Sequence, residues 1–191
     1  MKGIIFNLVE ETVSTEYGDD TWDSLLEAAD VEGAYTSLGN YDDAEIHRLV
    51  DAGSEALDVP AKDLTEWLGR DALLRLSARY PHFFAPHAST RPFLLTLNDV
   101  IHPEVRKVHP DSQPPDFDFS GADPRVLVMT YRSARRLCAL AEGMVRGAAE
   151  FYGEQVAVTH DVCMLRGADR CELTCTFEPA GEADDAAGVD R

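Results

Sequence analysis

Three cysteines and one histidine near the end of the sequence have types and spacing that could bind a metal ion. The four side chains are His160, Cys163, Cys171 and Cys175. On a predicted strand at about 171–178, Cys171 and Cys175 share the apolar face. A turn near residue 167 would bring His160 and Cys163 opposite them. Cys163 has the opposite strand parity to His160, so a bulge or strand end must turn it inward. Three thiolates and one imidazole are typical of structural zinc, so the pattern predicts a Zn²⁺ site.

Other interpretations of these cysteines stay open. The spacing matches none of the common zinc-finger patterns, so reduced cysteines that fill a core would also explain it. A disulfide is less favoured in a reducing compartment. If the zinc site forms, reversible thiol oxidation with zinc release could add a redox input. The fourth cysteine, Cys138, is predicted to be a packing residue outside the site.

A second candidate is His102, which lies on the apolar face of a predicted helix with Leu94, Leu95 and Val105. One interpretation is a core histidine whose ring nitrogens are satisfied by backbone groups. The other is an axial ligand of a metal cofactor, because neutral imidazole is a good iron donor inside an apolar wall. Pro103 disfavours helical geometry at His102 and removes a backbone donor, so we expect the helix to bend or restart there.

A third candidate is the motif Tyr131-x-Ser133-x-Arg135, where a predicted strand turns into a long helix. Ser133 is a plausible N-cap for that helix, whose N-terminus would attract an anion. Arg135 can pair with a carboxylate through two hydrogen bonds, and the Tyr131 hydroxyl adds a neutral donor. The motif suits a cofactor with two adjacent carboxylates. The alternative is an ordinary capped helix with a surface arginine.

The elements that must position these residues change in type along the chain. The first 90 residues show helical periodicity, and residues 109–124 are rich in proline and predict an extended connection. The remainder predicts a strand at 125–129, a helix at 133–151, strands at about 155–163 and 171–178, and an acidic disordered tail at 179–191. This order predicts an α+β fold rather than a βαβ nucleotide-binding fold.

Composition narrows the class of protein. The 191 residues include 17 Lys+Arg and 35 Asp+Glu, and the formal net charge of −18 argues against binding to nucleic acid or to an anionic membrane surface. No apolar run approaches the roughly 18 residues of a transmembrane helix, and the short apolar start is too brief for a signal peptide. No phosphate-binding glycine loop or nucleophilic serine motif is present. We therefore expect a cytoplasmic protein that is not an enzyme.

Taken together, these motifs resemble the heme–nitric oxide/oxygen binding (H-NOX) family, whose members are related to the heme domain of soluble guanylate cyclase. The resemblance covers residues 1 to about 178 and rests on Met1-Lys2-Gly3-Ile4-Ile5, Tyr80-Pro81-His82-Phe83-Phe84, Asn98-Asp99-Val100-Ile101-His102 and Tyr131-Arg132-Ser133-Ala134-Arg135. It implies a bound heme b. The residues implied to hold it are His102 as the axial iron ligand, Tyr131, Ser133 and Arg135 at the propionates, and Ile5 and Pro115 pressing on the porphyrin.

The same resemblance implies a fold and supports the metal site. It implies a helical N-terminal lobe at about 1–60 and a C-terminal lobe at about 61–178 that contains a small antiparallel sheet plus helices. The heme would lie between the two lobes. Some family members also have a C-terminal cysteine–histidine zinc site, which favours the zinc interpretation.

The resemblance further indicates which gas is bound. Oxygen-binding members carry a distal tyrosine five residues after the motif arginine, and this chain has Leu140 there. The other distal positions correspond to Val9 and Leu74. Bound oxygen needs a hydrogen-bond donor, whereas nitric oxide binds ferrous heme strongly without one. An apolar pocket therefore predicts binding of nitric oxide and carbon monoxide and exclusion of oxygen.

The resulting hypothesis is a heme-based nitric oxide sensor in which binding of the gas releases His102. The expected partner is a separate sensor histidine kinase or cyclic-di-GMP enzyme. One alternative is a redox or thiol sensor whose main input is the zinc site. Another is a gas-carrying or heme-storage protein without a partner.

Overall fold

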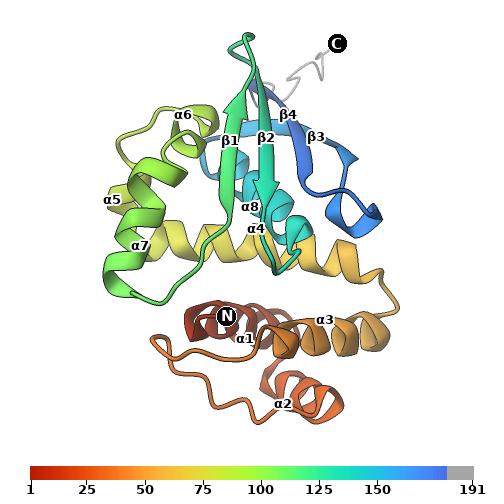
Figure 1. Cartoon of the computed structure of the whole chain (residues 1–191). Coiled ribbons are helices and arrows are strands. Elements are labelled where there is room, and N and C mark those ends of the chain that lie inside the picture. The colour runs from red at the N-terminus through yellow and green to blue at the C-terminus, as the bar shows by residue number, and fades with distance from the viewer. Residues whose placement is uncertain (180–191) are drawn as a thin grey trace, which may run out of the picture.

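The chain folds into a helical part followed by a part that mixes helices and strands (Figure 1). The computed structural model describes residues 1–179. Its elements are α1 (Gly3–Tyr17), α2 (Asp19–Ala29), α3 (Asp43–Leu57), α4 (Ala61–Arg79), α5 (Pro81–Phe84), α6 (Thr90–Leu94), the π-helix η1 (Leu97–Ile101), α7 (His102–Val108), β1 (Asp116–Ser120), β2 (Val126–Arg132), α8 (Cys138–Phe151), β3 (Glu154–Val162), the 3₁₀-helix η2 (Met164–Arg166) and β4 (Cys171–Pro179). The predicted α+β class is confirmed. The acidic tail predicted from residue 179 falls mostly on residues 180–191, which lie outside the described part, and Pro179 ends β4.

The four strands form one antiparallel sheet in the order β1-β2-β4-β3. Phe117 of β1 pairs with Tyr131 of β2, and Tyr131 pairs in turn with Cys171 of β4. Alternate residues of β2 and β4 are buried, so one face of the sheet is apolar, and α8 packs against the sheet. The prediction missed β1, because the alternating Asp-Phe-Asp-Phe-Ser segment is only five residues long and follows a proline-rich segment.

Two clusters of buried side chains make up the core, and α4 contributes to both. The N-terminal cluster joins α1, α2, α3 and α4 through residues such as Phe6, Val9 and Leu68. The other cluster joins α8, the sheet and the short helices that precede it, and it includes Leu73. Figure 1 shows α4 running between the three N-terminal helices and the sheet. This helix is therefore the element through which the two parts of the chain meet.

The contact between α4 and α8 depends on glycine. A Cβ atom built on Gly143 would overlap the carbonyl oxygen of Glu66, and one built on Gly69 would overlap the carbonyl oxygen of Leu140. A Cβ on Gly147 would lie 2.5 Å from the carbonyl oxygen of Arg70. These obstacles are backbone atoms, which cannot rotate away. The two helices therefore approach too closely for any larger residue at these positions.

We predict that Gly143→Ala destabilises the protein by about 3 kcal/mol, because overpacking against backbone forces the helices apart. The measurement is the free energy of unfolding in urea. Glu150→Ala on the same helix is the control, since it removes only an exposed ion pair with Arg70 and should cost less than about 1 kcal/mol. Equal stability of Gly143→Ala and the wild-type protein would contradict the close helix contact.

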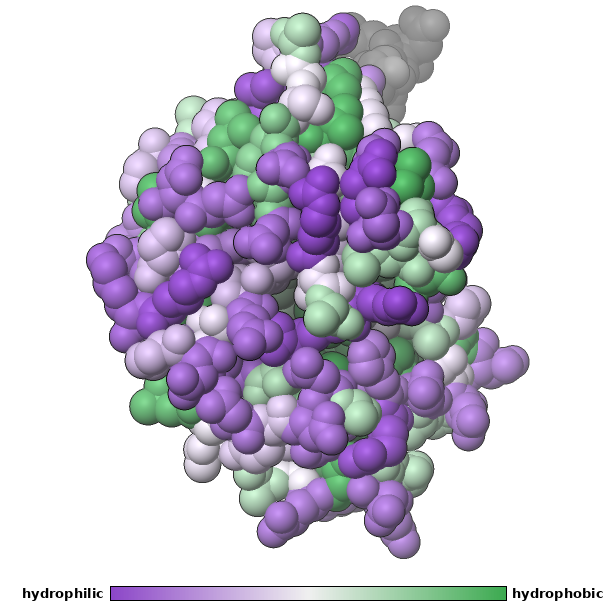
Figure 2. Space-filling view, in the orientation of Figure 1, coloured by the Kyte–Doolittle hydropathy of each residue, from purple (hydrophilic) through white to green (hydrophobic). Residues whose placement is uncertain are grey.

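The face drawn in Figure 2 is largely hydrophilic, and its apolar residues occur in small scattered groups. Within residues 1–179, every helix falls short of the length and hydropathy that a bilayer-spanning segment needs.

Candidate functional site

His102 is the first residue of α7 and directly follows the π-helix η1. The predicted restart of the helix is confirmed, with Pro103 in the first turn of α7. The expectation of non-helical geometry at His102 is wrong, because its φ of −64° and ψ of −37° are helical. The wider turn accommodates the proline, since the backbone N–H groups of Ile101 and His102 donate five residues back, to Thr96 and Leu97.

The His102 ring packs over β1 rather than into a continuous helical stripe. It lies 6.0 Å, centroid to centroid, from the Phe117 ring, at an angle of 28°. Of its predicted neighbours, Leu94 is buried but Leu95 is 37% exposed, so the predicted apolar face is only partly correct. Burial, with the charge of Arg106 adding to it, lowers the pKa of His102 to about 4. The imidazole is therefore neutral at physiological pH, which is the state that can bind a metal.

Tyr131 and Ser133 lie at the end of β2 and in the turn that follows. The Tyr131 ring is 5.7 Å from that of Phe117, so it is one residue further from His102 along the same row of aromatic rings. Its hydroxyl accepts a hydrogen bond from the backbone N–H of Leu137 at 3.1 Å. Burial raises the pKa of Tyr131 to about 12, so the hydroxyl keeps its proton and can donate it.

The predicted role of Ser133 as a helix N-cap is wrong. Its Oγ accepts a hydrogen bond from the backbone N–H of Arg135 at 3.3 Å, within a turn. The helix begins only at Cys138, because Arg136 has a left-handed backbone with φ of 55° that cannot continue a helix. The helix therefore starts five residues later than the predicted residue 133, so residues 133–137 are not helical as predicted.

Arg135 joins the two parts of the chain. Its Nε donates to Asp43 Oδ1 at 2.8 Å, and Asp43 is the first residue of α3. Its Nη1 donates to the carbonyl oxygen of Gln113 at 2.5 Å, in the segment before β1. A guanidinium has five N–H donors, so donors remain for an anionic ligand. The guanidinium of Arg135 thus lies close to the end of β2, which carries Tyr131, and to the turn that carries Ser133.

The remaining predicted contact residues are apolar and belong to different elements. Val9 of α1 and Leu140 of α8 belong to the same N-terminal cluster. Leu74, on α4, is half-buried and is in neither core cluster over residues 1–179. Ile5 on α1 and Pro115 just before β1 are also half-buried. Val9 and Leu140 therefore share one apolar cluster, and within residues 1–179 that cluster does not include Leu74.

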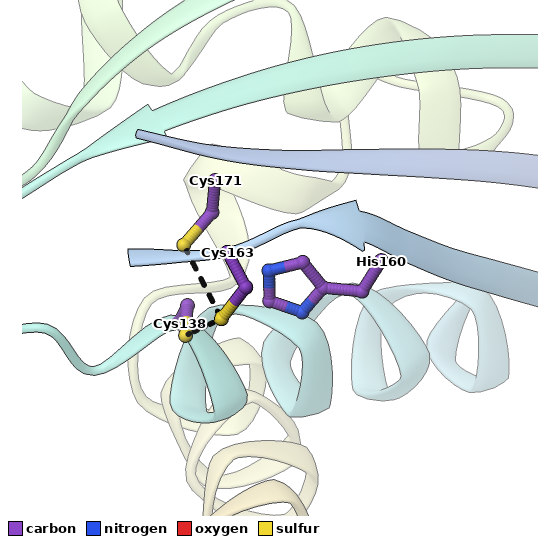
Figure 3. A group of neighbouring side chains, drawn as sticks. All are labelled: Cys138, His160, Cys163 and Cys171. Carbon is purple, nitrogen blue, oxygen red and sulfur yellow. Dashed lines mark hydrogen bonds between the residues drawn. The ribbon is translucent and has the colours of Figure 1, made fainter. Parts of the chain in front are cut away.

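The structure assembles a cysteine–histidine cluster, and its membership corrects the prediction. Cys138, His160, Cys163 and Cys171 each offer one ligand atom, and these four atoms all lie within 4.8 Å of one another (Figure 3). Cys163 Sγ is 3.9 Å from Cys138 Sγ and 4.0 Å from Cys171 Sγ. The predicted member Cys175 lies elsewhere, with its Sγ 4.0 Å from Met129 Sδ. Cys138, predicted to be a bystander, takes the fourth place.

Strand register explains why the prediction chose the wrong fourth residue. Cys175 pairs with Val158, so His160, two residues further along β3, lies past Cys175 rather than opposite it. Cys138 begins α8, which packs against the sheet that carries Cys171. One feature of the sequence could have identified Cys138. A helix that covers the apolar face bearing Cys171 must place some of its own side chains there.

The cluster has the chemistry of a zinc site. The Nε2 of His160 is buried and has no hydrogen-bond partner within residues 1–179, so a metal ion would satisfy it. Burial raises the pKa of the Cys138 thiol. Burial also disfavours the Cys163 thiolate, but backbone N–H groups of Leu165 and Arg166 and the neighbouring thiols outweigh it and lower the pKa of Cys163. Three sulfurs and one imidazole nitrogen suit tetrahedral Zn²⁺.

Comparison with known proteins finds the same architecture in gas-binding heme proteins. A family model described as haem-NO-binding matches residues 2–160. An H-NOX protein from Shewanella oneidensis, solved in the Fe(II)NO state, is 30% identical with a TM-score of 0.87, covering 93% of this chain and 99% of that chain. Unliganded Fe(II) H-NOX from K. algicida is 25% identical with a TM-score of 0.84, covering 93% and 97%. IWP-051-bound H-NOX from Shewanella woodyi, in the Fe(II)CO state, is 28% identical with a TM-score of 0.79, covering 97% and 98%.

Proposed function

The chain belongs to the haem-NO-binding (H-NOX) family, and on that premise we propose that it is a heme-based nitric oxide sensor that regulates a separate signalling protein. The observation that carries the proposal is His102, a neutral imidazole at the start of a short helix, packed against an aromatic row that leads to Tyr131. H-NOX proteins from Shewanella oneidensis have been solved with nitric oxide and with carbon monoxide. We assign this protein the role of a sensor rather than of an enzyme.

The residues present fit a heme b with two propionates. In this proposal His102 is the axial ligand, and Arg135, Tyr131 and Ser133 hold the propionates. Arg135 supports that role because its guanidinium retains unused donors beside the turn. Tyr131 supports it because its hydroxyl accepts from Leu137 and keeps a proton to donate. Ile5 and Pro115, each half-buried, would contact the porphyrin.

The proposed distal residues are apolar and give selectivity among gases. Val9, Leu74 and Leu140 have no side-chain donor, and Val9 and Leu140 belong to one apolar cluster. Oxygen bound to ferrous heme carries negative charge and needs a hydrogen bond to be retained. We therefore propose that the pocket accepts nitric oxide and carbon monoxide and excludes oxygen.

The proposed switch is the movement of α7. Bound heme would supply a ferrous iron that binds the gas, and we expect His102 to leave the iron when nitric oxide binds. The helix that starts at His102 has seven residues and no fully buried side chain. Such a helix has little local stability once its anchor is released. A weakly held α7, which carries the proposed iron ligand His102, provides the two-state element that a sensor needs.

We propose that the output protein is a sensor histidine kinase or a cyclic-di-GMP enzyme in the cytoplasm. The net charge of −18 would suit a basic patch on either one. The test compares inhibition of such an enzyme by ferrous, nitric oxide-bound and oxidised protein. A change with nitric oxide supports the sensor, a change with oxidation alone supports the redox alternative, and no change supports a gas carrier.

A second function is favoured by the cysteine–histidine cluster. We propose that Cys138, His160, Cys163 and Cys171 bind structural Zn²⁺, since their ligand atoms lie within 4.8 Å of one another. Oxidation of the thiolates would form disulfides and release zinc, which would give the protein a redox input. The cluster lies between α8 and the β3–β4 turn, and Cys171 pairs across the sheet with Tyr131, so the proposed metal site adjoins one of the proposed propionate residues.

We expect Cys171→Ser to lose zinc, while Cys175→Ser retains it. Both residues are fully buried cysteines on β4, so the pair separates metal binding from packing. The measurement is zinc content by elemental analysis after dialysis, with near-stoichiometric zinc in the wild type and in Cys175→Ser. Loss of zinc from Cys175→Ser instead would restore the set predicted from the sequence.

A further inference from the structure

Glu142 is a buried carboxylate beside the cysteine–histidine cluster, and neither proposed function uses it. The residue is 3% exposed, and its Oε2 has no hydrogen-bond partner within residues 1–179. Burying a carboxylate oxygen without a hydrogen-bond donor is costly. Its location therefore needs an explanation beyond packing.

Glu142 is part of a row of functional side chains on α8. Cys138, Glu142 and Arg146 follow one another at intervals of four residues and so lie on the same face of the helix. Glu142 Oε1 accepts a hydrogen bond from Arg146 Nη2 at 3.0 Å, and Arg146 Nε also pairs with Glu66 of α4. One carboxylate oxygen is thus fixed by Arg146, which is anchored in turn to a second helix. The other oxygen is left for a different partner.

That partner is His160. Glu142 Oε2 lies 3.5 Å from His160 Nδ1 and 3.9 Å from Lys62 Nζ. The second ring nitrogen of His160, Nε2, is buried without a hydrogen-bond partner within residues 1–179. Figure 3 shows the His160 ring directed toward the three cysteines. If Nε2 binds the metal, Nδ1 must carry the proton, and Glu142 is placed to accept it.

We propose that Glu142 is a positioning residue for the metal site, accepting the Nδ1–H of His160 and holding the ring with Nε2 toward the thiols of Cys138, Cys163 and Cys171. The inference rests on the metal site proposed above. Histidines that bind metals usually donate their other N–H to a carboxylate or carbonyl, and loss of that partner weakens metal binding about 10–100-fold. On α8, therefore, one face supplies both a thiol ligand and the carboxylate that orients the imidazole ligand.

The test measures zinc affinity of the full-length, heme-containing protein by competition with a chromophoric chelator. Glu142→Gln keeps the size of the side chain but cannot accept a charge-assisted hydrogen bond, so we expect about 10–100-fold weaker zinc binding with unchanged stoichiometry. Glu66→Gln is the matched control. It removes the other carboxylate that contacts Arg146 but does not face His160, and we expect its zinc affinity to stay within about twofold of the wild type.

A second readout separates orientation of His160 from general stability. In the diamagnetic ferrous carbon monoxide form, the His160 Nδ1–H should appear in proton–nitrogen spectra as a slowly exchanging signal. We expect this signal in the wild type and in Glu66→Gln, and its rapid exchange in Glu142→Gln. If Glu142→Gln does not fold with heme, Glu142→Asp replaces it, because the shorter carboxylate should bind zinc less tightly than the wild type.

Two results would have different meanings. Wild-type zinc affinity in Glu142→Gln, with zinc bound to both proteins, would overturn the role of Glu142 and leave the metal site intact. Wild-type protein that takes up no zinc would overturn the metal site and this inference together.

Discussion

The His102→Gly variant is expected to resemble the nitric oxide-bound protein while no nitric oxide is present. Reconstituted with heme and imidazole, the variant should keep its heme, because free imidazole replaces the side chain as the iron ligand, but α7 is then no longer linked to the iron. In this heme-containing variant, amide hydrogen exchange in α7 should be about tenfold or more faster than in the unliganded wild type. That change corresponds to about 1.4 kcal/mol of lost anchoring. The reason is that α7 has no fully buried side chain to hold it in place.

His47→Ala serves as the control for this prediction, because His47 is exposed on α3, away from α7. Its α7 exchange should match that of the unliganded wild type and should accelerate only when nitric oxide is added. If α7 of ferrous His102→Gly exchanged as slowly as α7 of the unliganded wild type, release of the histidine could not be the switch.

The second large effect concerns oxygen. Ferrous wild-type protein in air should form no stable oxygen complex, and Leu140→Tyr should raise oxygen affinity about 10–100-fold. The added hydroxyl would donate to the bound oxygen, and a hydrogen bond to a charge-bearing group contributes about 1.5–3 kcal/mol. Leu140 is half-buried at the edge of the N-terminal cluster, so the substitution changes a boundary position rather than a fully buried one.

Leu140→Phe distinguishes the hydroxyl from the ring, because it has the same size without the donor. Its oxygen affinity should equal that of the wild type. The measurement is the absorption spectrum of ferrous protein during oxygen titration. A persistent oxygen complex in the wild type, or equal gains with Phe and Tyr, would show that the distal apolar residues do not set the selectivity.

Structural features that depend only on neighbouring residues are the most predictable from the sequence. The restart of the helix at His102 follows from Pro103 alone, because a missing backbone donor acts within one turn. The three longer strands follow from alternation of apolar residues. The short strand β1 could not be predicted in this way, because its five residues follow a proline-rich segment and are too few to establish an alternation of apolar and polar residues.

The membership of the metal cluster could not be read from spacing, because it depends on register. The pairing of Val158 with Cys175 places His160 past Cys175, and nothing in the local sequence specifies that register. The start of α8 depends on the left-handed conformation of Arg136, a residue type that rarely adopts it. Both features are set by packing between distant elements. The orienting role of Glu142 likewise becomes visible only when β3 lies against α8.

The most direct test of the central claim is the absorption spectrum of the purified ferrous protein under anaerobic conditions, before and after nitric oxide is added. The account predicts about one heme per chain and a shift of the Soret band with about one equivalent of nitric oxide, and it predicts loss of heme binding in His102→Gly without imidazole. Protein that takes up no heme, or whose heme spectrum nitric oxide leaves unchanged, would contradict it.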